Sequence, residues 1–253
     1  MATKKRHLSG WAPDRPDFRD LRFTPRKIKL PTSIDLRTTP NEPPVYDQGQ
    51  LGSCTGNGVG DCFEFELRKQ GLSDFVPSRL FIYYNERVIE GTVKQDAGAQ
   101  IRDGIKAVAH SGAPDEQMWP YVIKKFSTKP PAKVYKAAAL RKVSQYKRVD
   151  NSDSANLKMA IASGFPVVFG ATLYESFESR AVEQTGRVPM PKKDEKTIGG
   201  HCMVIVGYQS TDFIVRNSWG TTWGDKGYCR IPQAYLCNTD LADDFWIITE
   251  ITK

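Results

Sequence analysis

Long apolar runs are missing from this 253-residue sequence. No segment approaches the roughly 20 consecutive apolar residues that a membrane-spanning helix needs. The first residues, MATKKRHLSG, are basic and lack the apolar core of a Sec-type signal peptide. We therefore predict no membrane partner, and a protein that is cytoplasmic or exported by a route without a Sec signal peptide.

Cysteine is present, but not in the pattern of a disulfide framework or a metal site. The five cysteines are an odd number scattered along a chain of this size, which does not predict a set of disulfides. No CxxC or HxxxH spacing indicates a structural metal ion, and we predict no cofactor. Cys62, Cys229 and Cys237 are expected to be small buried hydrophobic residues.

Positive charge is in excess, but mainly in the N-terminal segment. The chain has 36 basic and 29 acidic side chains, a net charge of +7. Residues 1–30 hold nine basic and three acidic side chains, or +6, which leaves +1 for the rest. The body therefore lacks the basic balance of a nucleic-acid-binding domain, and we expect no nucleic-acid partner. We also expect a monomer.

Helical patterns fill the first half of the chain and strand patterns fill the second. Amphipathic segments that end at glycines predict helices in the first half. Short β-branched and aromatic runs predict antiparallel strands in the second half. The helices are expected at 55–70, 77–91 and 99–112, and the strands at 166–174, 201–208, 213–219, 227–231 and 245–251. This order predicts an α+β protein of two lobes with a cleft between them.

The stretch DQGQLGSC carries the first chemical signal. Gln48 stands six positions before Cys54, and Cys54 stands where a glycine-rich turn leads into the predicted helix. Free N–H groups and the positive dipole end of a helix favour a thiolate, so we expect a lowered pKa for this thiol. The Gln48 amide is placed to donate to an oxyanion beside the sulfur.

A cysteine nucleophile needs a base, and the base needs a group that orients it. Of the three histidines, His201 is the one placed well for catalysis, because it opens an apolar strand after two glycines. Asn217 ends the strand expected to pair with the His201 strand, and its amide oxygen can accept the imidazole N–H. The sequence therefore predicts a Cys54–His201–Asn217 constellation.

These segments resemble the papain-like cysteine proteases, the family of the cathepsins. The resemblance is carried, in order, by QGQLGSC, GGHCMVIVGY and NSWGTTWGDKGY, and extends to LPTSIDLR and EQMWPY. It covers roughly residues 30–250 and is closest to bacterial-type members with a short N-terminal propeptide and no family disulfides. It implies a papain-like fold, with a mostly helical first lobe, an antiparallel β-sheet or barrel in the second, and the active-site cleft between.

The resemblance also assigns roles to individual residues. It implies that Cys54 is the nucleophile, His201 its base and Asn217 the group that orients the ring. Gln48 and the Cys54 backbone N–H would form the oxyanion hole. The residues it places at the substrate are Gly52, Ser53, Gly98, Ala99, Gly200 and Trp219, of which Trp219 would also shield the Asn217–His201 bond.

Three positions depart from the family pattern. Leu51 stands where the family has a half-cystine before the nucleophile, and the partner cysteine near Asp96 is missing too. Thr55 replaces the usual aromatic residue after the nucleophile. These departures bear on substrate preference more than on the chemistry.

The N-terminal arm, residues 1–29, resembles a short propeptide. We predict that it is an intramolecular inhibitor, removed near Arg26 and Lys27 or displaced. The peptidase domain would then span residues 30–253, with a helical lobe at roughly 48–125 and a β lobe at roughly 126–250.

The predicted function is that of a cysteine endopeptidase acting on protein or peptide substrates. One alternative is a transpeptidase or ligase that uses the same acyl-enzyme. Another is a binding module that uses the basic segment 122–149, which holds nine basic and no acidic side chains. A third, a nucleotide site at the glycine-rich run 56–60, lacks the strand-to-helix context and the lysine of a P-loop, and close helix packing explains its glycines better.

Overall fold

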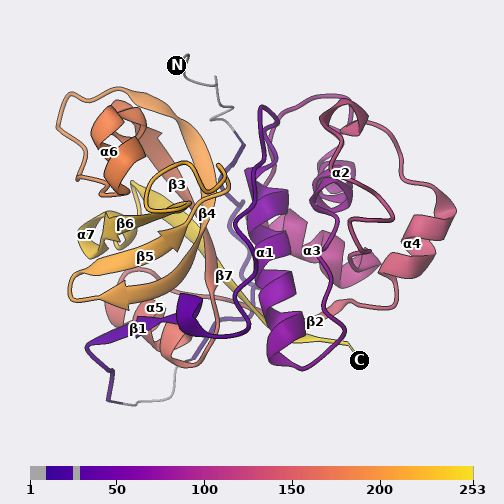
Figure 1. The fold of residues 1–253 in the computed structure, drawn as a ribbon, viewed down its shortest axis with the longest axis horizontal. Coiled ribbons are helices and arrows are strands. Elements are labelled where there is room, and N and C mark those ends of the chain that lie inside the picture. Colours follow the sequence, from indigo (N-terminus) through magenta and orange to yellow (C-terminus); the bar gives the residue numbers. More distant parts are fainter. Residues whose placement is uncertain (1–9, 25–28, 253) are drawn as a thin grey trace.

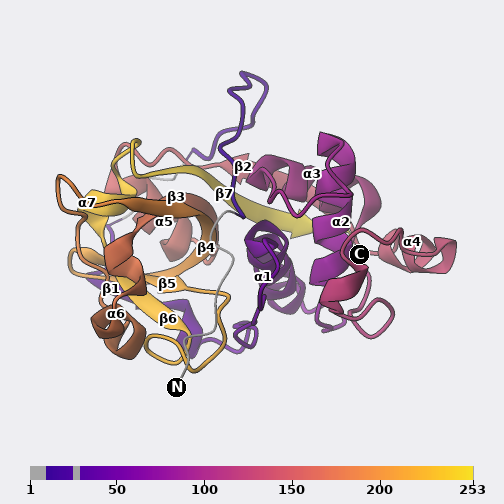
Figure 2. The same cartoon turned by 90° about the horizontal axis from the view of Figure 1, so that it is seen from above.

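Helix α1 (Cys54–Lys69) lies at the centre of the molecule, with the sheet on one side and α2, α3 and α4 on the opposite side (Figure 1; Figure 2). The computed structural model describes residues 10–24 and 29–252. Fourteen residues of α1, from Cys54 to Leu67, are buried, as expected of a helix enclosed by two lobes. No helix in these described ranges is long and apolar enough to cross a membrane.

Two glycines let α1 approach its neighbours closely. A Cβ on Gly56 would lie 2.9 Å from the backbone oxygen of Arg79 in the next helix. A Cβ on Gly58 would lie 2.9 Å from Cys202 Sγ on the sheet. Because both distances are shorter than real Cβ contacts, the glycine-rich run serves packing, as the sequence predicted.

The helical lobe is built from α2, α3 and α4. Ser78 caps α2 by accepting the N–H of Phe81 at 3.2 Å, and Gly91 ends that helix in the left-handed conformation with φ 73°. The bounds are Arg79–Glu90 for α2, Ile101–Ser111 for α3 and Ala132–Ala138 for α4.

The position of α4 differs from the predicted lobe boundary near residue 126. Val134 and Ala138 of α4 belong to one apolar cluster with Leu80 and Phe81 of α2. The helix therefore packs in the helical lobe, although its sequence follows the predicted boundary. The sequence did not show this because α4 is short and its apolar face becomes visible only against α2.

The β lobe is a seven-stranded antiparallel sheet in the described residues. Its strands run in the order β2-β7-β3-β4-β5-β6, and β1 also pairs with β4. The bounds are β1 Ser33–Asp35, β2 Val143–Arg148, β3 Val167–Tyr174, β4 Thr197–Gln209, β5 Asp212–Arg216, β6 Tyr228–Pro232 and β7 Ala242–Ile251. The predicted strands correspond to β3 through β7, whereas β1 and β2 were not predicted, since one is only three residues long and the other is polar.

Short helices complete the β lobe. α5 packs against β3 and β4, and α6 and α7 lie at the outer side of the sheet (Figure 1). Their bounds are Ser154–Ala162 for α5, Arg180–Thr185 for α6 and Gln233–Leu236 for α7. In the described residues of both lobes, short 3-10 helices lie at Leu36–Thr38, Ile123–Lys125 and Glu175–Glu178.

Candidate active site

Cys54 is the first residue of α1, so its thiol lies at the positive end of the helix dipole. The backbone N–H of Cys202 donates to Cys54 Sγ at 3.3 Å. Burial raises the pKa of the Cys54 thiol to about 12, although the N–H groups of Cys202 and Thr55 act in the opposite direction. The lowered pKa predicted from the helix terminus is therefore not found in this covered state of the site.

The Gln48 side chain is fixed through both ends of its amide. Ser218 Oγ donates to Gln48 Oε1 at 2.6 Å, and Gln48 Nε2 donates to the backbone oxygen of Leu51 at 2.9 Å. Because Nε2 carries two N–H groups, one remains beyond the bond to Leu51. The amide is thus oriented with its donor end on the loop that leads to Cys54.

Asp96 holds this loop where the family resemblance indicated a missing disulfide. The backbone N–H of Gly52 donates to both Asp96 carboxylate oxygens, at 3.1 and 3.0 Å. The Tyr83 hydroxyl donates to Asp96 Oδ1 at 2.5 Å. Leu51 is buried in an apolar cluster with Tyr83 and Trp119. Hydrogen bonds and packing therefore brace the loop in place of a covalent bond.

His201 lies on β4 and is paired with Asn217, which follows β5. His201 Nε2 and Asn217 Oδ1 are 2.8 Å apart. Asn217 Oδ1 also accepts the backbone N–H of Ser218 at 2.8 Å, which fixes the amide with its oxygen toward the ring. The Trp219 ring lies 5.0 Å from the His201 ring, and Phe177 packs edge-on against Trp219 at 5.4 Å. This aromatic cover keeps water from the histidine–asparagine bond.

The described part of the N-terminal arm lies directly over the thiol. A Cβ on Gly10 would be 2.6 Å from Cys54 Sγ and 2.7 Å from the backbone oxygen of Gly52. Only a glycine fits at such a contact. Cys54 and His201 are both 0 % exposed, so the arm and the lobes together leave the reacting groups no contact with solvent.

The arm is held across the cleft by backbone hydrogen bonds to both lobes. The N–H groups of Gly10 and Trp11 donate to Gly200 O at 3.2 and 3.3 Å. On the helical side, Ala99 N–H donates to Gly10 O, and Ala12 N–H donates to Ala99 O, each at 3.1 Å. Trp11 and Ala99 form a parallel bridge. An extended backbone is therefore bound beside the nucleophile.

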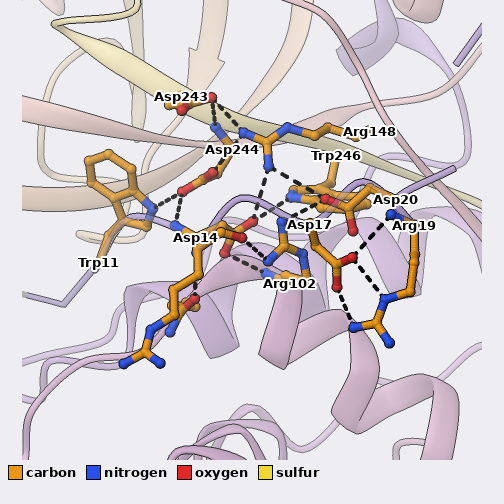
Figure 3. Close-up of polar contacts among 12 residues, drawn as sticks. Trp11, Asp14, Asp17, Arg19, Asp20, Arg102, Arg148, Asp243, Asp244 and Trp246 are labelled. Atoms are coloured by element: carbon orange, nitrogen blue, oxygen red, sulfur yellow. Dashed lines mark hydrogen bonds and ion pairs between the residues drawn. The ribbon is translucent and has the colours of Figure 1, made fainter. Parts of the chain in front are cut away.

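Side chains extend this attachment beyond the cleft (Figure 3). The Trp11 indole Nε1 donates to Asp244 Oδ2 at 3.1 Å, and the Asp14 backbone N–H donates to the same oxygen at 2.7 Å. Asp14 accepts the Trp246 indole N–H at 2.9 Å and the Arg102 backbone N–H at 3.1 Å. Burial, and then the charge of Asp244, raise the pKa of Asp14 to about 7.

A second set of ion pairs anchors the following residues. Arg102 contacts Asp20 at 2.6 Å, and Arg148 contacts Asp243 at 2.7 Å and Asp244 at 3.0 Å. Beyond them, Phe23 N–H donates to Arg148 O at 2.8 Å, so the arm runs along the edge of β2. The arm is thus attached at three successive places, and the predicted removal site near residues 26 and 27 lies outside the described residues.

The predicted substrate-side residues are not all placed alike. Ala99 and Gly200 bind the arm backbone, and a Cβ on Gly98 would lie 2.6 Å from Gly10 O. Ser53 instead directs its hydroxyl to the Tyr121 hydroxyl at 2.5 Å, inside the helical lobe. The side chain of Ser53 therefore supports the loop, and its place beside the substrate stays a prediction.

Sequence reasoning missed the residues that bind the arm and brace the loop. Asp96 was noted only as the place of a missing cysteine, and Asp244 carried no signal because it belongs to no motif. Trp11 and Asp14 were read as part of an arm without defined contacts. Trp11 is one of the few apolar residues of the arm, with Phe18, Leu21 and Phe23, and nothing in the sequence indicates which of them enters a pocket.

The site joins a cysteine at a helix N-terminus on one lobe to a histidine–asparagine pair on the sheet of the other. This arrangement defines a hydrolase that uses a cysteine nucleophile. The described fold is that of the papain-like proteases. The family model described as papain family cysteine protease matches residues 30–245, and the chain belongs to this family.

Individual relatives agree with this assignment. An uncharacterised peptidase C1-like protein of Acanthamoeba polyphaga mimivirus is 42% identical over an alignment of 270 residues. The alignment covers 96% of this chain and 87% of the relative. The solved structure of xylellain, a cysteine protease from Xylella fastidiosa, is 41% identical, covers 98% of this chain and 99% of its own, and has a TM-score of 0.89.

Cathepsins are more distant. Cathepsin K of Mus musculus is 28% identical over an alignment of 230 residues that covers 87% of this chain. This chain spans 66% of the length of that cathepsin. The comparison therefore supports the family and leaves the substrate of this chain to be argued from its own site.

Proposed function

We propose that this cysteine protease is an endopeptidase made with its own N-terminal arm as an inhibitor. The observation that carries the proposal is the extended arm bound beside Cys54 by the backbones of Ala99 and Gly200. A cleft that binds an extended backbone on both sides is suited to a peptide substrate.

The chemistry follows from the side chains beside that backbone. The Cys54 thiolate attacks a peptide carbonyl carbon while His201 holds the proton taken from the thiol. His201 then gives the proton to the leaving amine, and a water molecule hydrolyses the thioester. Asn217 keeps the imidazole in the tautomer and orientation that this exchange requires.

Charge develops on the carbonyl oxygen during attack, and donors must already be aimed at it. The oriented Gln48 amide and the Cys54 backbone N–H at the helix terminus are the candidates. Removing one such donor typically lowers the rate by about 10²–10³-fold.

The Gly10 backbone supports the role of the arm as an inhibitor and not as a substrate. The carbonyl oxygen of Gly10, the described residue nearest the thiol, accepts the N–H of Ala99. It is therefore committed to the helical lobe and is not free to enter the oxyanion hole beside Gln48.

Peptide hydrolysis by the full chain and by a chain that begins at Leu30 tests the proposal. We expect the shorter chain to cleave a fluorogenic peptide faster, and Cys54→Ala to remove cleavage in both. A full-length chain as active as the shorter one would contradict inhibition by the arm. Product analysis with an added amine separates hydrolysis from transpeptidation, which shares the thioester.

A further inference from the structure

Thr55 departs from the family pattern directly after the nucleophile, and its hydroxyl lies inside the helical lobe. The residue is buried and follows Cys54 in the first turn of α1. Its Oγ1 donates to Glu86 Oε1 on α2 at 2.6 Å. A carboxyl group of the neighbouring helix is therefore bound to the residue next to the reacting cysteine.

Glu86 is enclosed by α1, α2 and α3, which pack against one another (Figure 2). Its side chain is 0 % exposed. A Cβ on Gly104 of α3 would lie 2.6 Å from Glu86 Oε2, so a glycine at this position leaves the room that the carboxyl group occupies. In the described residues Oε2 has no hydrogen-bond partner, and Thr55 alone donates to the carboxyl group.

A carboxyl group with one donor in such surroundings is favoured without charge. A buried carboxylate needs further hydrogen bonds or a paired cation. The adjacent Arg87 does not supply them, because its guanidinium donates to four backbone oxygens. Burial raises the pKa of Glu86 well above its ordinary value, and Glu90 and Asp103 raise it further, against the opposing effects of Thr55 and Arg87. Glu86 therefore carries a proton at neutral pH.

The charge state of Glu86 bears on the nucleophile. Burial raises the pKa of the Cys54 thiol most, and a negative charge on Glu86 raises it further. Glu86 also faces the Tyr83 hydroxyl on α2 and the Cys202 thiol on β4, and burial raises the pKa of both, so both are uncharged at neutral pH. Since His201 lies on the opposite side of the cleft, a charge on Glu86 opposes the thiolate more than it favours the imidazolium.

We propose that Glu86 is a positioning residue for the nucleophile: through the Thr55 hydroxyl it fixes the first turn of α1, and it must be uncharged for the thiolate to form. The inference rests on the proposed role of Cys54 and adds a loss of activity at alkaline pH, where Glu86 releases its proton to solvent. The competing explanation is that Glu86 only supports the packing of the three helices, which would affect activity equally at every pH.

The test uses the full-length chain with Trp11→Gly as the parent, because we expect loss of this anchor to open the cleft. Glu86→Gln keeps an acceptor for Thr55 and has no charge at any pH. We expect its kcat/KM on a fluorogenic peptide, divided by that of the parent, to rise by about 3–10-fold from pH 7 to pH 9.5, since a change of one in the pKa of a thiol is a tenfold change in thiolate. The division cancels the titration of groups that both chains share.

Glu66 offers a matched control on the same helix. Its side chain is also buried, and burial raises its pKa to about 7. It lies near the other end of α1, about 18 Å from Cys54 along the helix axis. Glu66→Gln removes an equal charge and should keep a constant ratio to the parent over the same pH range.

Substitutions at Thr55 test the link between Glu86 and the helix. Thr55→Val removes the hydroxyl at nearly the same volume, so kcat at pH 7 should fall by about 2–10-fold. The alkaline loss should also begin at higher pH, because Glu86 loses the bond that favours its charged form. Thr55→Ser keeps the hydroxyl and should restore both values. A Thr55→Val chain with the kcat of the parent would contradict the link.

Alkylation of Cys54 by iodoacetamide, followed by mass spectrometry, measures the thiolate without peptide cleavage. We expect the rate of Glu86→Gln, divided by that of the parent, to show the same rise with pH. A ratio that stays constant from pH 7 to pH 9.5 would overturn the proposal and leave Glu86 a packing residue. If alkylation shows the rise but no peptide is cleaved, the endopeptidase function is wrong and the coupling of Glu86 to Cys54 stands.

Discussion

The two sides of the cleft hold their reacting groups by different means. On the helical side, Cys54 follows a loop that a few polar contacts fix, among them the bonds from Gly52 to Asp96 and from Gln48 to Leu51. On the sheet side, His201 lies within β4, which is paired with β3 along eight residue pairs. The loop before Cys54 depends on single hydrogen bonds and on the packing of Leu51, whereas His201 is held in a continuous ladder.

The arm also treats the two sides differently. Its backbone bonds reach both sides, Ala99 on the helical side and Gly200 on the sheet side. Its side chains differ, because Trp11 fills a slot against Gly170 on β3 and donates to Asp244 on β7, whereas Asp14 and Asp20 contact Arg102 on α3. A buried aromatic side chain therefore anchors the arm on the sheet side, and polar contacts anchor it on the helical side.

The largest expected effect is loss of the reacting groups from either side. Cys54→Ala and His201→Ala should each lower peptide hydrolysis by about 10⁴-fold or more, because nucleophile and base act as one unit. Circular dichroism and the midpoint of thermal unfolding serve as controls for the fold. An active variant at either position would contradict the assigned mechanism.

Emptying the slot on the sheet side should have the next largest effect. Trp11→Gly removes the buried anchor of the arm, and loss of a buried tryptophan typically costs about 3–5 kcal/mol. We expect hydrolysis by the full chain to rise by about 10²-fold or more, measured as kcat/KM on a small peptide.

The matched control is Phe18, an aromatic residue of the arm whose side chain is exposed. Phe18 is 99 % exposed, so Phe18→Gly should leave the rate of the full chain unchanged. Equal activation by both substitutions would mean that general loosening of the arm, not the slot, sets inhibition.

Weakening the loop on the helical side should cost less. Asp96→Ala removes the acceptor of the Gly52 N–H and should lower the free energy of unfolding by about 1–3 kcal/mol, with a loss of kcat. Tyr83→Phe removes the hydroxyl that donates to Asp96 and accepts the Gly98 backbone N–H, and should cost about 0.5–1.5 kcal/mol for each of the two bonds. Denaturant titration measures both, and an Asp96→Ala chain of unchanged stability would show that packing of Leu51 alone braces the loop.

The smallest expected effect is a pH dependence of the arm. Asp14 faces Asp244, Arg102, Arg148 and Trp246, and its pKa is about 7 with the arm docked, above its ordinary value of 3.8. Between about pH 4 and 7 the docked arm therefore keeps a proton that the free arm has released. This contribution to docking is complete below about pH 4 and is lost as the pH rises through about 7.

We expect the inhibition of the full chain to weaken several-fold between pH 6 and 8. The quantity to measure is the activity of the full chain divided by that of Trp11→Gly at each pH, which cancels the titration of the catalytic groups. Asp14→Asn carries no titrating proton and should flatten the ratio. A ratio that falls as the pH rises would refute this assignment of the proton.

The sequence could predict those parts of the site that local chemistry requires. Cys54 had to start a helix, and His201 had to open a strand, so both were visible in local patterns. Asp96 and Asp244 were not visible, because each contacts a residue more than 40 positions away. Asp244 also lies in a bulge between β3 and β7 that no local pattern encodes. The cytoplasmic location and the monomeric state stay predictions.

The sequence by itself predicted the order of α1 to α3 and of β3 to β7, because each element follows from a residue pattern within a few positions. It also predicted the Cys54–His201–Asn217 constellation, from a local signal at each position and from the family resemblance. Only the tertiary structure decided that Trp11 enters a slot floored by Asp244, that Asp96 replaces a disulfide, and that α4 packs on α2. Those features join segments distant along the chain, and their energies arise from burial and hydrogen bonds that exist only once the lobes are assembled.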